Sequence, residues 1–87
     1  MPKIEIYSGP HCPYCVRAKG LLDRKRAEYT EYDISKNEET FVKMLQRTGG
    51  RKSIPQIFID DQLIGGCDDL HALDRDGKLD LLLGKEK

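Results

Sequence analysis

The order of strand and helix patterns near the start of the chain constrains its fold most strongly. Residues 3–7 alternate charged and apolar side chains, which predicts a strand that buries one face and turns Glu5 outward. Residues 12–25 carry apolar side chains at helical spacing, and residues 29–34 are again rich in strand-forming residues. A strand, a helix and a second strand in this order almost always form a right-handed unit with two parallel strands.

The rest of the chain predicts a helix, a hairpin and a last helix. Asn37 can cap a helix with an acidic first turn, which ends at the glycine pair 49–50. Residues 56–60 and 62–64 predict an antiparallel hairpin, and residues 70–83 predict one C-terminal helix that an Asp-Gly pair could interrupt. We therefore expect an α/β fold of the order β-α-β-α-β-β-α, with a four-stranded mixed sheet and three helices.

Length and charge limit the class of protein. A chain of 87 residues has room for one domain, which we expect to span residues 1–87. The formal net charge is zero and the charges are dispersed, so nucleic-acid binding has little electrostatic support. The apolar runs are far shorter than the roughly 20 residues that span a bilayer, and the first residues do not resemble a secretory signal. We expect a cytoplasmic monomer that binds neither nucleic acid nor membrane.

A cysteine pair at the start of the first predicted helix carries the strongest chemical signal. In the segment Cys12-Pro13-Tyr14-Cys15, the first cysteine lies at the helix N-terminus, where free N–H groups and the helix dipole favour a thiolate. Cys15 instead points along the apolar face of the helix. We therefore expect Cys12 to attack an external disulfide, and Cys15 or a second thiol to resolve the mixed disulfide that results.

Two alternative interpretations of the pair are weaker. A zinc site would need two more ligands, and the chain offers only Cys67, His11 and His71, none of them in a second closely spaced pair. A buried, inert pair would not place a cysteine beside a proline at a helix N-terminus. We therefore expect redox chemistry and no metal site.

Three sequence motifs resemble those of the dithiol glutaredoxins, in particular the small bacterial glutaredoxin 3 type. They lie at residues 12–15, 53–59 and 65–69, in the order of that family, and cover nearly the whole chain. The resemblance implies a thioredoxin fold, no bound cofactor, and glutathione as the reducing cosubstrate. The implied substrates are protein disulfides, such as that of ribonucleotide reductase, and glutathione-mixed disulfides, with a role in cell redox homeostasis.

The resemblance also assigns roles to residues of all three motifs. It makes Cys12 the nucleophile and Cys15 the resolving thiol, and it makes Pro55 a cis proline. It assigns glutathione binding to Tyr14 as a wall of the groove, to Ser53, Ile54 and Pro55 beside the cysteinyl backbone, and to Gly66, Cys67, Asp68 and Asp69 around the γ-glutamyl group. Without the resemblance, the two acids are helix N-terminal residues favoured by the dipole, and Cys67 is a packing residue more often than a redox-active one.

One position departs from the family pattern. Many relatives have a lysine three positions before the first cysteine of the motif, where it can stabilise the thiolate and contact the glycyl carboxylate of glutathione. This chain has Gly9 there. Arg51, Lys52 and His11 are the basic residues that could take over this contact.

Two rival functions share these motifs. A glutaredoxin-like donor to ribonucleotide reductase takes its electrons from thioredoxin reductase, but the Gly-Gly-Cys-Asp-Asp segment together with Cys-Pro-Tyr-Cys favours glutathione. A dimer can also bind an iron–sulfur cluster between two Cys12 thiolates and two glutathiones. In the family, a proline at position 13 is associated with redox work rather than with cluster assembly, which argues against the dimer.

Overall fold

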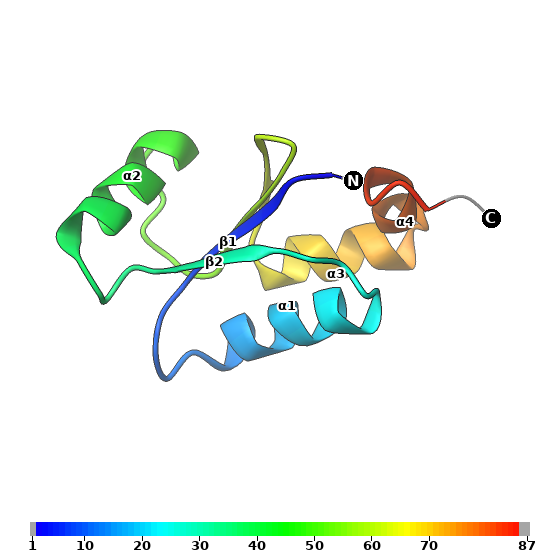
Figure 1. The fold of residues 1–87 in the computed structure, drawn as a ribbon, viewed down its shortest axis with the longest axis horizontal. Helices are drawn as coiled ribbons and strands as arrows, with labels where there is room; N and C mark the ends of the chain where they lie inside the picture. Colours follow the sequence, from blue (N-terminus) through cyan, green and yellow to red (C-terminus); the bar gives the residue numbers. More distant parts are fainter. Residues whose placement is uncertain (1, 86–87) are drawn as a thin grey trace.

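The structure, a computed structural model, describes residues 2–85 as a four-stranded sheet with helices on both of its faces (Figure 1). Along the chain, the elements are β1 (Ile4–Ser8), α1 (Pro13–Arg24), β2 (Thr30–Asp33), α2 (Glu38–Thr48), β3 (Gln56–Ile59), β4 (Gln62–Gly65), α3 (Cys67–Arg75) and α4 (Lys78–Leu82). The strands lie in the order β2-β1-β3-β4, with β1 and β2 parallel and the other neighbouring pairs antiparallel. The predicted element order and mixed sheet are confirmed.

Local sequence signals set the ends of the first two helices. Pro13 occupies the first turn of α1, where its fixed φ suits a helix and its missing N–H costs nothing. The Oδ1 atom of Asn37 accepts a hydrogen bond of 2.8 Å from the Thr40 N–H and so caps α2. Gly49 ends α2 in a left-handed conformation with φ of 73°.

The C-terminal segment forms two helices where the sequence predicted one. Gly77 adopts a left-handed conformation, with φ of 75°, between α3 and α4, and its N–H donates to the Asp74 carbonyl. This conformation costs glycine little but interrupts a right-handed helix. The break falls in the Asp-Gly pair at which the sequence predicted a possible interruption, so four helices cover the sheet within residues 2–85.

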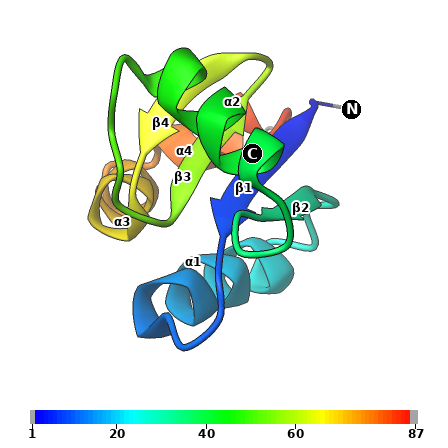
Figure 2. The same cartoon turned by 90° about the vertical axis from the view of Figure 1, so that its left-hand side faces the viewer.

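Helices α1, α3 and α4 enclose the main apolar core on one face of the sheet (Figure 1, Figure 2). The core includes Ile6 of β1, Leu22 of α1, Ile57 of β3, Leu70 of α3 and Leu79 of α4, each with 0% of its surface exposed. Burying one such side chain stabilises the fold by about 1.5–3 kcal/mol. The core thus fixes α1 and α3 beside each other against the sheet.

Helix α2 covers the opposite face, and there the prediction for Glu5 is wrong. Glu5 was expected to face outward, but it is only 4% exposed beneath α2. The Arg47 guanidinium of α2 contacts both of its carboxylate oxygens, at 2.9 and 3.2 Å, and the Tyr32 hydroxyl donates at 2.9 Å. Burial raises the pKa of Glu5, but these hydrogen bonds outweigh burial and hold the pKa below its usual value. A paired carboxylate can therefore be buried in the sheet.

All three sequence motifs meet at the edge of the sheet formed by the strand ends, where β1 and β4 end and β3 begins. The end of β1 leads into α1, while the antiparallel β3 begins at the same edge, with Tyr7 opposite Gln56. Strand β4 ends there too, with Gly65 opposite Ile57, and leads directly into α3. None of the helices that the structure describes is long and apolar enough to cross a membrane.

Candidate active site

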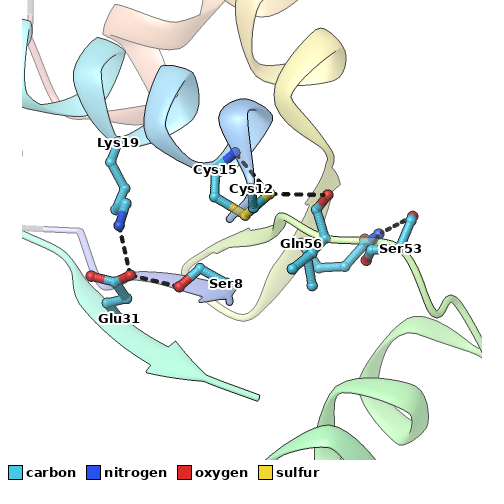
Figure 3. Close-up of a disulfide and its surroundings, with 8 residues drawn as sticks. Ser8, Cys12, Cys15, Lys19, Glu31, Ser53 and Gln56 are labelled. Carbon is cyan, nitrogen blue, oxygen red and sulfur yellow. Dashed lines mark hydrogen bonds and ion pairs between the residues drawn. A yellow bond between two sulfur atoms is a disulfide. The ribbon is translucent and has the colours of Figure 1, made fainter. Parts of the chain in front are cut away.

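Cys12 and Cys15 form a disulfide at the N-terminus of α1 (Figure 3). Their Cα atoms are 5.2 Å apart. Cys12 is the N-cap residue, is partly exposed, and its Sγ accepts the Cys15 N–H at 3.1 Å, whereas Cys15 is 1% exposed. The two sulfurs are therefore unequal, because only Cys12 combines access from outside with a hydrogen bond from the helix end.

The loop before the cysteine pair lies close to the loop before β3. A Cβ atom at Gly9 would be 3.0 Å from Cδ1 of Ile54, so a side chain at position 9 would have to displace that isoleucine. The absence of a side chain at Gly9 leaves this space to Ile54. The Ile54 carbonyl oxygen lies 3.9 Å from the Sγ of Cys12, so backbone from the second motif borders the reactive sulfur of the first.

The Ile54–Pro55 peptide bond is cis, which confirms the expectation from the resemblance. Gln56 holds Ser53, the residue before Ile54. Its buried side-chain Nε2 donates to the Ser53 carbonyl at 3.0 Å and to the Ser53 hydroxyl at 3.2 Å (Figure 3). This role of Gln56 was not predicted, since a glutamine in a predicted strand gives no signal of this local contact.

A cavity of about 220 Å³ brings together all eight residues that the resemblance assigned to glutathione. It is lined by Tyr14, Ser53, Ile54, Pro55, Gly66, Cys67, Asp68 and Asp69, and also by Arg51 and Gln56. Lys52 and His11 do not line it, so Arg51 is the one of the three candidate cations that faces the cavity. Four larger hollows elsewhere on residues 2–85 contain no cysteine. Contact of these side chains with glutathione stays a prediction.

The start of α3 forms one wall of this cavity. The Asp69 carboxylate accepts the Gly66 N–H at 2.9 Å and thereby caps the helix. A Cβ atom on Gly65 would overlap that carboxylate, and Gly65 has φ of 119°, so this position requires glycine. Asp68 is exposed beside the capped turn. Of the two acids, Asp69 therefore has a structural partner, and Asp68 is available to a ligand.

Cys67 begins α3 as a buried thiol, 4% exposed. Burial raises its pKa; the charge of Arg17 acts in the opposite direction, and that of Asp68 adds to the effect of burial. His71 donates its Nδ1–H to the Cys67 carbonyl at 2.9 Å, and the same nitrogen is 3.4 Å from the sulfur. Across residues 2–85, no three cysteine, histidine or acidic side chains group as metal ligands would.

A polar network next to Cys15 was not predicted. The Ser8 hydroxyl at the end of β1 and the Lys19 ammonium of α1 donate to the same carboxylate oxygen of Glu31, at 2.6 and 2.8 Å (Figure 3). The hydrogen bond from Lys19, followed by that from Ser8, lowers the pKa of Glu31. The network ties the helix of the cysteine pair to β2. The network depends on how the parallel strands β1 and β2 are aligned, which no local sequence signal indicates.

Comparison with known proteins gives a consistent result. The glutaredoxin family model matches residues 4–64. The chain is 52% identical to glutaredoxin 3 of Escherichia coli K12 over 83 residues, or 95% of this chain and 99% of that protein. It is 57% identical to a probable glutaredoxin of Synechocystis over 81 residues, or 93% of this chain and 92% of that protein.

Solved structures agree with the sequence matches. The solution structure of a glutaredoxin from Brucella melitensis superimposes with a TM-score of 0.80 at 52% identity, covering 98% of this chain and 94% of that one. A buckwheat glutaredoxin in complex with glutathione gives a TM-score of 0.85 at 32% identity, covering 95% and 77%. With its dithiol motif on this thioredoxin fold, the chain belongs to the glutaredoxin family of thiol–disulfide oxidoreductases.

Proposed function

We propose that this protein uses glutathione to reduce glutathione-mixed disulfides and protein disulfides, through attack by Cys12. The observation that carries the proposal is the cavity next to Cys12, because it joins residues of three distant motifs beside one accessible sulfur. Its volume of about 220 Å³ suits part of a small peptide rather than a folded chain. The proposed setting is a monomer acting in the reducing cytoplasm.

The first step is a thiol–disulfide exchange at Cys12. The Cys12 thiolate attacks the glutathione sulfur of a mixed disulfide, the Cys12–glutathione disulfide forms, and the substrate leaves as a thiolate that takes up a proton. The Cys15 N–H, which donates to the Cys12 sulfur at 3.1 Å, would stabilise the thiolate before attack. A second glutathione then attacks this intermediate, which releases oxidised glutathione and regenerates Cys12.

In this proposal, the tripeptide lies along the backbone of residues 53–55. An extended peptide can add to such a segment through main-chain hydrogen bonds, so its cysteine sulfur would reach Cys12, 3.9 Å from the Ile54 carbonyl. Tyr14 would form one wall of the groove. The glycyl carboxylate would meet Arg51, the cation that lines the cavity.

The γ-glutamyl end would bind at the N-terminus of α3. The first backbone N–H groups of a helix have no partner within the helix, so those of Cys67 and Asp68 suit a carboxylate. The γ-glutamyl ammonium would pair with the Asp68 side chain, because the Asp69 carboxylate already accepts the Gly66 N–H. Cys67 then contributes its backbone while its thiol stays packed.

In this proposal, reduction of protein disulfides, such as that of ribonucleotide reductase, requires Cys15. Attack by Cys12 leaves one substrate cysteine bound to the enzyme, and Cys15 lies close enough to displace it, with a Cα–Cα separation of 5.2 Å. A resolving thiol held in the same helix turn has an effective concentration that no dissolved thiol reaches. The products are the reduced substrate and the Cys12–Cys15 disulfide, which two glutathiones then reduce.

A coupled assay tests the proposal directly. A glutathionylated peptide is supplied with glutathione, glutathione reductase and NADPH, and NADPH consumption is followed. We expect turnover that depends on glutathione, and none when thioredoxin reductase alone replaces glutathione and its reductase. Turnover only with thioredoxin reductase would contradict the use of glutathione and favour the rival electron donor.

A further inference from the structure

Exposed apolar side chains concentrate beside the reactive cysteine. Tyr14 and Val16 are 54% and 65% exposed, and they are two of the four large apolar side chains that stay exposed among residues 2–85. Val16 lies one helical turn after Cys12 and donates its N–H to the Cys12 carbonyl at 3.1 Å. Isolated exposed apolar residues are common, but a pair beside a reactive sulfur is suited to contact with a substrate.

The acidic side chains at this edge of the sheet mostly have partners within the chain. Glu31 accepts from Lys19 and Ser8, Asp33 accepts the Ser35 N–H and hydroxyl, and Asp69 accepts the Gly66 N–H. Of the three, Glu31 is paired with a cation, whereas Asp33 and Asp69 accept hydrogen bonds from neutral groups. Asp68 is the exception, and it is assigned above to the γ-glutamyl ammonium.

Two basic side chains next to residues that line the cavity have no such partners. Arg17 and Lys52 are exposed, and neither has an ion pair within the part of the chain that the structure describes. The Arg17 guanidinium lies 5.7 Å from the centre of the Tyr14 ring, at the border of the cavity, and Lys52 directly precedes Ser53, which lines it. Positive charge is therefore available on both the helix side and the loop side of the site.

Val16, Arg17 and Lys52 form what we call the docking rim. They do not line the cavity, so a small tripeptide seated there would leave them free, while the protein half of a disulfide would project past them. We propose that the docking rim selects protein substrates whose reacting cysteine is flanked by acidic side chains. This inference rests on the proposed function and names its substrate class.

The test uses three peptides with one cysteine each, which differ only in having Glu, Gln or Lys on both sides of it. Each is supplied as its homodisulfide to pre-reduced protein without glutathione, and the release of peptide thiol is timed in a single turnover. Cys12 and Cys15 supply the two electrons, so each turnover gives two peptide thiols and one oxidised protein. We expect the Glu peptide to react about tenfold faster than the Gln peptide, and the Lys peptide to react slowest.

Two measurements show whether the docking rim causes this order. In about 0.5 M salt the Glu preference should fall towards one, because exposed charges are screened. The double variant Arg17→Gln with Lys52→Gln should lose the preference, yet reduce bis(2-hydroxyethyl) disulfide, a small neutral substrate, at the wild-type rate. The matched control, Arg24→Gln with Lys78→Gln, makes the same charge change at exposed positions at the far end of α1 and on α4 and should keep the preference.

Equal rates for the three peptides would overturn the inference, as would a preference that persists in the double variant of the docking rim. The proposed function fails on a separate observation, namely the absence of glutathione-dependent turnover in the coupled assay. Because the single-turnover reaction contains no glutathione, one result does not decide the other.

Discussion

Helices α1 and α3 both begin at the candidate active site with a cysteine, yet their first turns differ in chemistry. At α1, Cys12 is the cap, its sulfur accepts the Cys15 N–H, and the first turn has no acidic residue. At α3, Cys67 lies inside the first turn, its sulfur is buried, and Asp68 and Asp69 follow it. One helix end directs the Cys15 N–H at a sulfur of its own chain, whereas the other has first-turn N–H groups that we propose for a ligand.

This difference shows that a helix N-terminus does not by itself make a cysteine reactive. The position of the sulfur relative to the end of the helix decides whether the N–H groups reach it, and nearby carboxylates oppose the thiolate. Burial raises the pKa of Cys67, so the Cys67 side chain stays a thiol at neutral pH. The two ends thus provide a nucleophile next to one small cavity and a proposed carboxylate site within it.

The largest contrast is expected when each cysteine is replaced in turn. Cys12→Ser should reduce turnover of a glutathionylated peptide to the background rate, because no other residue can form the mixed disulfide. Cys67→Ser should keep activity within about twofold of wild type, since its proposed contribution is a backbone N–H. Steady-state rates of both variants test this. A tenth or more of wild-type activity in Cys12→Ser would show that another cysteine is the nucleophile.

Alkylation of the reduced protein should separate the thiols without any mutation. At about pH 6, iodoacetamide should modify Cys12 about tenfold faster than Cys15 or Cys67, because only Cys12 has a thiolate favoured by the helix end. As the pH rises, Cys67 should remain slow, because its raised pKa delays thiolate formation. Peptide mass mapping over time measures all three rates. Equal rates for Cys12 and Cys67 would remove the distinction between the two helix ends.

Replacing the resolving cysteine should separate the activity on glutathione-mixed disulfides from the activity on protein disulfides. Cys15→Ser should keep most of the activity on a small glutathione-mixed disulfide, because dissolved glutathione can resolve that intermediate. It should lose at least about tenfold on a protein disulfide, where a thiol held in place is needed. The two rates are measured on the same preparation. Loss of both together would show that Cys15, which is 1% exposed, is required for the fold or that the single-thiol route does not operate.

The smallest effects concern the two acids of α3 and distinguish ligand binding from helix capping. Asp68→Ala should raise the KM for glutathione about fivefold through loss of an exposed ion pair, with little change in Tm. Asp69→Ala should lower the free energy of unfolding by about 1 kcal/mol, because the Gly66 N–H loses its acceptor. Glutathione kinetics and thermal unfolding of both variants are needed. An unchanged KM in Asp68→Ala would place the ammonium elsewhere.

The sequence predicted most of the fold because its signals were local. Asn37, Pro13 and the glycine pair act on neighbouring backbone, so helix ends could be inferred from them. Glu5 was wrongly expected to face outward, because its burial depends on Arg47, a residue 42 positions away that neutralises it. A pattern of alternating residues contains no information about the helix that covers the second face.

The residues of the candidate site could also be predicted from the sequence, but not the contacts between them. The family motifs named the residues that line the cavity, and the structure adds which of them already have partners. That Asp69 is a cap while Asp68 is exposed depends on Gly66 being the N-cap, because the acid three positions later is the one that accepts its N–H. Arg51 could be chosen over Lys52 only once the path of the loop was known.

The central position of β1 determines when this site can form during synthesis. Strand β1 pairs on one side with β2, about 25 residues later, and on the other with β3, whose last paired residue is Ile59. Until that residue has left the ribosome, the nascent chain contains the cysteine pair but only half of the sheet that supports it. Pairings so distant in sequence form slowly because a long loop must first close. The cysteines are therefore made early and the cavity is completed late, so a growing chain carries reactive thiols before it has a place to bind their partner.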